Sequence, residues 1–164
     1  MRQVEFVPFW LTDEVEVFTI RIDGKANTEI NEFILMFRNS NISRQSEEFA
    51  RIFQTLKNIT GKGAKENFFR PEGSINDRVC ALPLITAQRS TKANGTLRLY
   101  CIRVSDRLLI LGGGGEKKTK TYQEDPILFE KVHTLQEIDK VLTDLEQDGI
   151  DLSKDIINLT ININ

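Results

Sequence analysis

Histidine and cysteine are scarce in this sequence, and their scarcity excludes several kinds of site. There is one histidine, His133, and there are two cysteines, Cys80 and Cys101, among 164 residues. Structural zinc sites need about four Cys or His ligands at close spacing, and the chain has no such cluster. We therefore predict no metal site and no cofactor. Two cysteines also exclude a disulfide framework, so we expect free thiols that pack as small apolar side chains in strands.

Long apolar runs are absent as well. No segment approaches the roughly 18 consecutive apolar residues that a membrane span needs. The apolar stretch from Phe6 to Leu11 is short, and Asp13 and Glu14 follow it at once, which is unlike a signal peptide. The sequence therefore predicts a cytoplasmic protein without a membrane partner.

A nucleotide-binding phosphate loop is also absent, although four glycines at residues 112–115 precede a basic segment. Such a loop has a glycine, four residues and then Gly-Lys-Ser/Thr, and a helix begins directly after it. Here Glu116 interrupts the pattern, and the next predicted helix begins only at Pro126. We expect the glycines to end a strand as a flexible exit.

The formal net charge of −2 conceals a segregation of charge along the chain. Residues 1–50 carry five Lys/Arg and nine Asp/Glu, residues 51–120 carry fourteen and five, and residues 121–164 carry three and ten. A basic middle between acidic ends permits a surface that binds polyanions. We expect one exposed basic surface that contains Arg98 and residues 117–120. The alternative is that the acidic ends pair with the basic sheet inside the molecule.

Apolar periodicity and turn residues predict an α+β fold in a single domain, residues 1–164. The two helices that come first should form a helical hairpin, followed by a mainly antiparallel sheet of three to five strands and a long C-terminal helix. The predicted elements are a strand at 15–22, helices from Asn27 or Thr28 to 37 and from 43–46 to Gly61 or Gly63, strands at 79–84, 97–104 and 108–111, a helix from Pro126 towards Gly149, and a strand at 157–163.

Short connections make parts of this prediction specific. Ser105-Asp106 separates two apolar strands so closely that they should form an antiparallel hairpin. Asn94-Gly95 predicts a turn before that hairpin. Asp125 should cap the long helix, with Pro126 at the first helical position, where proline is favoured. The alternating tail is a half-buried strand that should pair with an N-terminal strand.

The hairpin and its basic continuation resemble the RelE/HigB family of type II toxins. In that family, a strand with an embedded arginine leads through a short turn into an apolar strand, which continues into a Lys-Lys-Thr-like segment and a proline-started helix. Here Arg98 lies in the first strand, and residues 117–121, Lys-Lys-Thr-Lys-Thr, precede Asp125-Pro126. The resemblance covers about residues 45–142. It leaves an N-terminal strand and helix and a C-terminal strand as extensions.

The resemblance implies a metal-independent mRNA interferase that cuts message on the ribosome and is neutralised by an antitoxin protein. In such chemistry the ribose 2′-OH attacks the adjacent phosphate, and cationic side chains stabilise the charge of the phosphorane. The catalytic candidates are Arg98, Lys117, Lys118 and Lys120. The candidates for RNA contacts are Tyr100, Arg103, Tyr122, Lys62, Lys65 and Arg70, with His133 as a further group for stacking or proton transfer.

Other functions fit the same features. A protein of this fold can be a non-catalytic module that binds a partner protein through its sheet, or a ParE-like inhibitor of DNA gyrase. Structural roles are also open for the candidate residues. Arg98 could pair with an acid of the long helix, and lysines at a strand end can simply keep an edge solvated.

Overall fold

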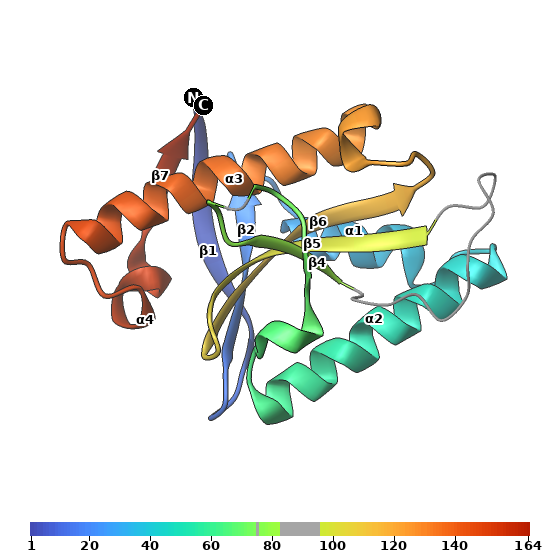
Figure 1. Ribbon diagram of the computed structural model, residues 1–164, viewed down its shortest axis with the longest axis horizontal. Helices are drawn as coiled ribbons and strands as arrows, with labels where there is room; N and C mark the ends of the chain where they lie inside the picture. The colour runs from blue at the N-terminus through green and yellow to red at the C-terminus, as the bar shows by residue number, and fades with distance from the viewer. Residues whose placement is uncertain (75, 83–95) are drawn as a thin grey trace.

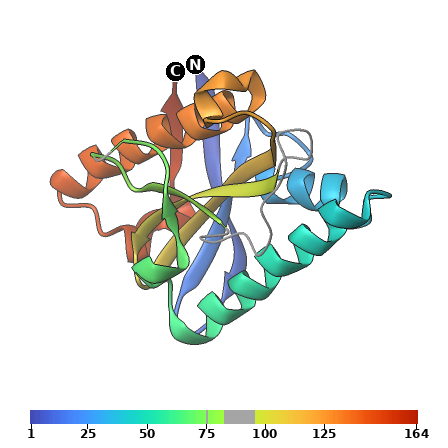
Figure 2. The same ribbon diagram turned by 45° about the vertical axis from the view of Figure 1, so that its right-hand side comes forward.

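The computed structural model describes residues 1–74, 76–82 and 96–164. These residues form an α+β fold in which helices cover both faces of a twisted sheet (Figures 1 and 2). The strands are β1 (Arg2–Leu11), β2 (Glu16–Ile22), β3 (Arg70–Pro71), β4 (Val79–Leu82), β5 (Thr96–Ser105), β6 (Leu108–Lys117) and β7 (Thr160–Ile163). The helices are α1 (Glu29–Phe37), α2 (Ser43–Lys62), α3 (Pro126–Gln147) and α4 (Leu152–Asp155), with 3₁₀ turns η1 (Glu66–Phe68), η2 (Tyr122–Glu124) and η3 (Ile156–Asn158).

The sheet is larger than predicted. Its strand order is β3-β4-β5-β6-β2-β1-β7, which gives seven strands within the described residues instead of three to five. In this sheet β2 and β6 run parallel, and the other neighbouring pairs are antiparallel, so the mainly antiparallel character is confirmed. The predicted turn at Asn94-Gly95 and the end of the predicted strand at 83–84 lie outside the described residues.

β1 is a strand that the sequence analysis did not place. It pairs antiparallel with β2, and the hydroxyl of Thr12 donates a hydrogen bond to the carbonyl oxygen of Val15 in the connection at 3.1 Å. β1 also pairs with β7, so the two chain termini lie side by side (Figure 1). The predicted pairing of the tail with an N-terminal strand is confirmed. The tail strand is shorter than predicted, because η3 occupies residues 156–158.

α1 and α2 pack on the same face of the sheet. The Thr28 hydroxyl caps α1 by accepting a hydrogen bond from the backbone N–H of Asn31 at 3.3 Å. α2 ends at Gly63, whose φ of +94° suits glycine. The helices meet where the rings of Phe33 and Phe49 stack, with centroids 5.9 Å apart. Together they form most of the connection that leads from β2 to β3. Parallel strands need a long crossover connection, and the two helices supply one that allows β2 to lie parallel to β6.

The predicted β5–β6 hairpin and its covering helix are confirmed. The two strands are antiparallel, and α3 packs across the face opposite to α1 and α2 (Figure 1). The carboxylate of Asp125 accepts hydrogen bonds from the backbone N–H groups of Ile127 and Leu128 at 2.9 and 3.2 Å. Pro126 occupies the start of the helix, as predicted.

The four glycines at residues 112–115 are not a flexible exit, contrary to the prediction. They form the buried second half of β6 and pair with β5. A Cβ on Gly112 would lie 2.8 Å from Leu135, and one on Gly115 would lie 3.1 Å from Leu128. Both leucines belong to α3, so the absence of side chains lets the helix lie directly on the strand.

Replacing Gly114 by alanine is expected to lower the free energy of unfolding by about 1–3 kcal/mol. The added Cβ would overlap the carbonyl oxygen of Arg98, so the backbone of β5 or β6 would have to shift. Urea-induced unfolding measures the effect. Gly61→Ala is the control, because nothing lies within 4 Å of a Cβ there. Alanine in helix α2 should stabilise the fold by about 0.5–1 kcal/mol. Equal effects of the two substitutions would contradict close packing at β6.

Two apolar cores hold the layers together, one on each face of the sheet. The core beneath α3 includes Tyr100, and the core beneath α1 and α2 includes Leu99 and Cys101. Successive side chains of a strand point to opposite faces. Arg98, two residues before Tyr100, therefore lies on the α3 face. Among the described residues, no helix is both long and apolar enough to span a bilayer.

Candidate functional site

The ten residues predicted to contact or cleave RNA do not form one surface. They divide mainly between the two ends of β5, with Arg98 near its beginning and Arg103 near its end. At the beginning of β5, on the α3 face, several of them lie close enough for their charges to act on one another. We call this group the Arg98 cluster, and its members are Arg70, Glu72, Arg98, Tyr100, Lys117 and Tyr122.

Strand register brings the cluster together. Arg70 in β3 pairs with Ala81 of β4, and Ala81 in turn pairs with Tyr100 of β5, so all three side chains share a face. Arg98 shares the face of Tyr100 because the two are separated by a single residue. Lys117, the last residue of β6, pairs with the first residue of β5. The predicted catalytic residues Arg98 and Lys117 therefore lie at the same end of the hairpin.

Arg98 is buried, with 6% of its surface exposed, and does not lie on an exposed basic surface as predicted. Its Nη1 donates a hydrogen bond to the carbonyl oxygen of Leu97 at 3.1 Å, but its Nε has no partner among the described residues. No carboxylate of the described chain forms an ion pair with it, so pairing with an acid of α3 is not observed. Burial lowers the pKa of Arg98, and the charge of Arg70 lowers it further.

The two tyrosines of the cluster are also buried. The hydroxyl of Tyr100 has no hydrogen-bond partner within the described part of the chain. Burial raises the pKa of Tyr100, and the negative charge of Glu72 raises it further. Burial and Glu72 raise the pKa of Tyr122 in the same way. Both hydroxyls therefore remain protonated at neutral pH and are available as hydrogen-bond donors.

Glu72 is the member of the cluster that the sequence analysis missed. Its side chain is 11% exposed, and its Oε1 lies 4.0 Å from the Nε of Arg70 without a hydrogen bond to any described residue. Burial lowers the pKa of Lys117, Glu72 opposes this shift, and Arg98 adds to it. In the sequence, Glu72 stands between Pro71 and Gly73 and signals only a turn. The pairing of β3 with β4 positions Glu72 in the cluster, and no local sequence pattern predicts this pairing.

The basic residues at the other end of β5 have structural partners. The guanidinium of Arg103 donates a hydrogen bond to the carbonyl oxygen of Ala64 at 2.6 Å and forms ion pairs with Asp106 and Glu66. Lys65 binds the same Asp106 at 2.9 Å. Hydrogen bonds from Lys65 and Arg103 lower the pKa of Asp106. These contacts connect the β5–β6 turn to the segment that follows α2.

The other candidate residues lie on the surface. Lys118 is exposed and pairs with Glu116 at 3.4 Å, and Lys120 and Lys62 are exposed. His133 on α3 stacks on Phe129 with ring centroids 5.7 Å apart and lies 3.7 Å from Glu137. The prediction of one basic surface from Arg98 to Lys120 is therefore wrong. Residues 118 and 120 lie outside the Arg98 cluster.

Arg78 belongs to the basic middle of the chain, and it pairs with acidic residues of the C-terminal part. The charge pattern of the sequence had left such pairing as an alternative. The guanidinium of Arg78 contacts the buried carboxylate of Asp139 and the exposed carboxylate of Glu146, each at 2.8 Å. Burial lowers the pKa of Arg78, but these two carboxylates raise it above its usual value. β4 is thereby tied to α3.

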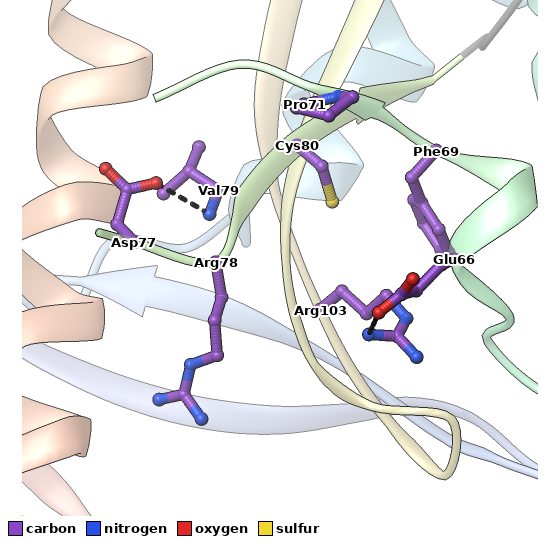
Figure 3. Close-up of a pocket in the computed structure, with 8 residues that line it drawn as sticks. All are labelled: Glu66, Phe69, Pro71, Asp77, Arg78, Val79, Cys80 and Arg103. Atoms are coloured by element: carbon purple, nitrogen blue, oxygen red, sulfur yellow. Dashed lines mark hydrogen bonds and ion pairs between the residues drawn. The ribbon is translucent and has the colours of Figure 1, made fainter. Parts of the chain in front are cut away.

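A pocket of about 440 Å³ opens beside β4 (Figure 3). Its lining includes Phe69, Cys80 and two arginines, Arg78 and Arg103. Both arginines are held by carboxylates, so the pocket offers little free positive charge. The described residues contain no group of three or more His, Cys, Asp or Glu side chains placed to hold a metal ion.

No family model, no curated protein and no solved structure matches this chain.

Proposed function

We propose that the chain is a toxin-like, metal-independent endoribonuclease that cleaves ribosome-bound mRNA and is neutralised by an antitoxin protein. The observation that carries the proposal is the Arg98 cluster. In it, Arg70 and Lys117 lie close enough to Arg98 for their charges to act on one another. The Nε of Arg98 and the hydroxyl of Tyr100 are two buried donors without partners among the described residues. Buried polar groups nearly always have partners, so unpaired donors beside cations favour an anionic ligand such as a phosphodiester.

The cluster contains the groups that RNA cleavage without a metal requires. In the proposed reaction, the 2′-oxygen forms a bond to phosphorus, the bond from phosphorus to the 5′-oxygen breaks, and Glu72 accepts the proton of the 2′-OH. Lys117, whose lowered pKa makes it a better acid, supplies a proton to the leaving oxygen. The planar guanidinium of Arg98 binds two phosphate oxygens, and Arg70 adds positive charge.

The order of elements also supports the proposal. Two helices, an antiparallel group of strands and a proline-started helix follow one another from α1 to α3. This is the order that the resemblance to RelE/HigB toxins implies. β1 and β7 pair with each other at one edge of the sheet, away from β5, and therefore extend the sheet without covering the Arg98 cluster.

The burial of Arg98 favours a second candidate function, a non-catalytic module that binds a partner protein. A side chain that is 6% exposed reaches a phosphate only when its neighbours move, whereas a structural arginine needs no movement. In this candidate the cluster holds β3, β5 and β6 together, and the sheet or its helices bind the partner. No described feature favours the ParE-like gyrase inhibitor over these two functions.

Cleavage of a defined mRNA on translating ribosomes tests the proposal. We expect fragments that end in a 2′,3′-cyclic phosphate, because the 2′-OH is the nucleophile. A message with a 2′-O-methyl group at the cut site should stay intact, since its 2′-oxygen has no proton to lose. Fragments with a 3′-hydroxyl end would contradict the mechanism.

Intact message together with DNA damage after induction in cells would favour the gyrase inhibitor. Intact message and normal growth would favour the interaction module.

A further inference from the structure

We propose that Cys80 and Cys101 form a thiol modification site, in which a hydroperoxide entering the pocket beside β4 oxidises the two thiols to an intramolecular disulfide. The two cysteines lie on the face of the sheet opposite to the Arg98 cluster, in the core beneath α1 and α2. The inference is therefore independent of the proposed ribonuclease function. It depends on the geometry of one cross-strand pair and on one pocket.

The two thiols are direct neighbours across antiparallel strands. Cys80 of β4 is in register with Cys101 of β5, and their sulfur atoms are 3.6 Å apart. Each sulfur also lies 3.7 Å from the carbonyl oxygen of the other residue. Directly opposed residues of an antiparallel pair have Cα atoms about 4.5–5.5 Å apart. This spacing falls within the range of about 4.4–6.8 Å that disulfides span. Bond formation therefore needs side-chain rotation and a small approach of the sulfurs.

Access to the pair is one-sided. Cys101 is fully buried, whereas Cys80 is 6% exposed and lines the pocket of about 440 Å³. Figure 3 shows the sulfur of Cys80 directed from β4 toward the side of the pocket where Phe69 and Arg103 lie. A small oxidant therefore meets Cys80 first, and Cys101 is the thiol positioned to react second.

The surroundings of the two sulfurs support these separate roles. Cys80 lines a pocket that a small oxidant can enter, whereas Cys101 has no exposed surface. Burial raises the pKa of the Cys101 thiol, and its hydrogen bond with Cys80 raises it further. Cys101 therefore keeps its proton until an oxidised Cys80 lies next to it.

The proposed reaction balances with one hydroperoxide. The Cys80 sulfur attacks the O–O bond, which breaks as an S–O bond forms, and Cys80 becomes a sulfenic acid while water (or an alcohol) leaves. The Cys101 sulfur then attacks the Cys80 sulfur. The S–S bond forms, the S–O bond breaks, and the hydroxide takes the Cys101 proton and leaves as water. Two thiols are oxidised, and one peroxide is reduced.

The disulfide would link β4, which is next to the edge strand β3, to β5, which lies further inside the sheet. The cross-link joins residues separated by 21 positions, and closing such a loop restricts the unfolded chain. The oxidised protein should therefore unfold at a higher urea concentration than the reduced protein.

The test uses the full-length protein, reduced and then treated with hydrogen peroxide under native conditions. We expect a monomer whose mass is lower by two hydrogen atoms, a peptide in which Cys80 is linked to Cys101, and recovery of both thiols with dithiothreitol. Two thiols that still alkylate after denaturation would overturn the inference. So would the loss of thiols through dimers or through sulfinic acid, without the Cys80–Cys101 peptide.

Cys101→Ala is the matched variant. Peroxide should convert its remaining Cys80 to sulfenic acid, which a dimedone probe traps, and should not raise its midpoint of urea unfolding. In Cys80→Ala, the buried Cys101 should resist peroxide at least ten times longer than Cys80 does in Cys101→Ala. Equal reactivity of the two thiols would contradict the one-sided access. If a variant does not fold, the peptide map of the wild-type protein still decides the inference.

Discussion

Replacing Arg98 by alanine is expected to slow mRNA cleavage about 10²–10³-fold, which is the usual loss for one electrostatic contact to a transition state. The guanidinium lies among the cations of the Arg98 cluster, and its Nε has no partner within the described residues. Its contacts to phosphate should strengthen as charge develops on the phosphorane, so kcat should fall more than KM rises. Single-turnover cleavage on ribosomes measures this split. In cells, relief of the growth arrest that induction causes reports the loss of cleavage activity.

Two variants separate a catalytic role of Arg98 from a structural one. Arg98→Lys keeps the positive charge but loses the planar fork, so it should recover only part of the rate. Lys118→Ala removes an exposed lysine that pairs with Glu116 at 3.4 Å, outside the cluster, and should leave the rate within about twofold. Urea unfolding must show that each variant is folded. Full activity of folded Arg98→Ala would remove Arg98 from the site and favour the interaction module.

Features that depend on neighbouring residues could be predicted from the sequence. Thr28 and Asp125 cap their helices, and Gly63 ends α2, because capping needs only a suitable side chain or a permissive backbone at one position. The β5–β6 hairpin follows from two apolar runs with a very short link. In each case the chemistry of a few adjacent residues determines the local structure.

Features that depend on distant contacts could not be predicted. The alternation of β1 is interrupted by a register shift between Pro8 and Trp10, which hides the strand in the sequence. The glycines of β6 resemble a loop, because the reason for them is the close approach of α3, a helix that comes later in the chain. Both errors concern residues whose conformation is set by a partner element.

The candidate site illustrates the same division. Arg98 and Lys117 could be placed together because they belong to one hairpin. The basic composition of residues 51–120 suggested that Arg103 and Lys65 would join them. A strand rises about 3.3 Å per residue, so Arg103 lies about 17 Å along β5 from Arg98. There it binds Asp106 instead. Charge counted along the sequence does not show which end of a strand each side chain occupies.

Replacing Arg78 by alanine is expected to lower the free energy of unfolding by about 3 kcal/mol, because it leaves a buried carboxylate without its cation. The side chain of Asp139 is 4% exposed and accepts hydrogen bonds from the Nε and the backbone N–H of Arg78, at 2.8 and 2.9 Å. The hydrogen bond from the backbone N–H of residue 78 to Asp139 remains after the substitution. We therefore expect the loss of stability at the lower end of the range of about 3–5 kcal/mol for a broken buried ion pair. Urea-induced unfolding measures the loss.

Glu146→Ala is the matched control, because Glu146 binds the same guanidinium at 2.8 Å from a side chain that is 36% exposed. An exposed ion pair contributes about 0.2–1 kcal/mol, so this variant should lose far less stability. Adding Asp139→Leu to Arg78→Ala removes the unpaired buried charge and should restore part of the loss. If Glu146→Ala destabilised the protein as much as Arg78→Ala, the exposed carboxylate and not Asp139 would be the partner that ties β4 to α3.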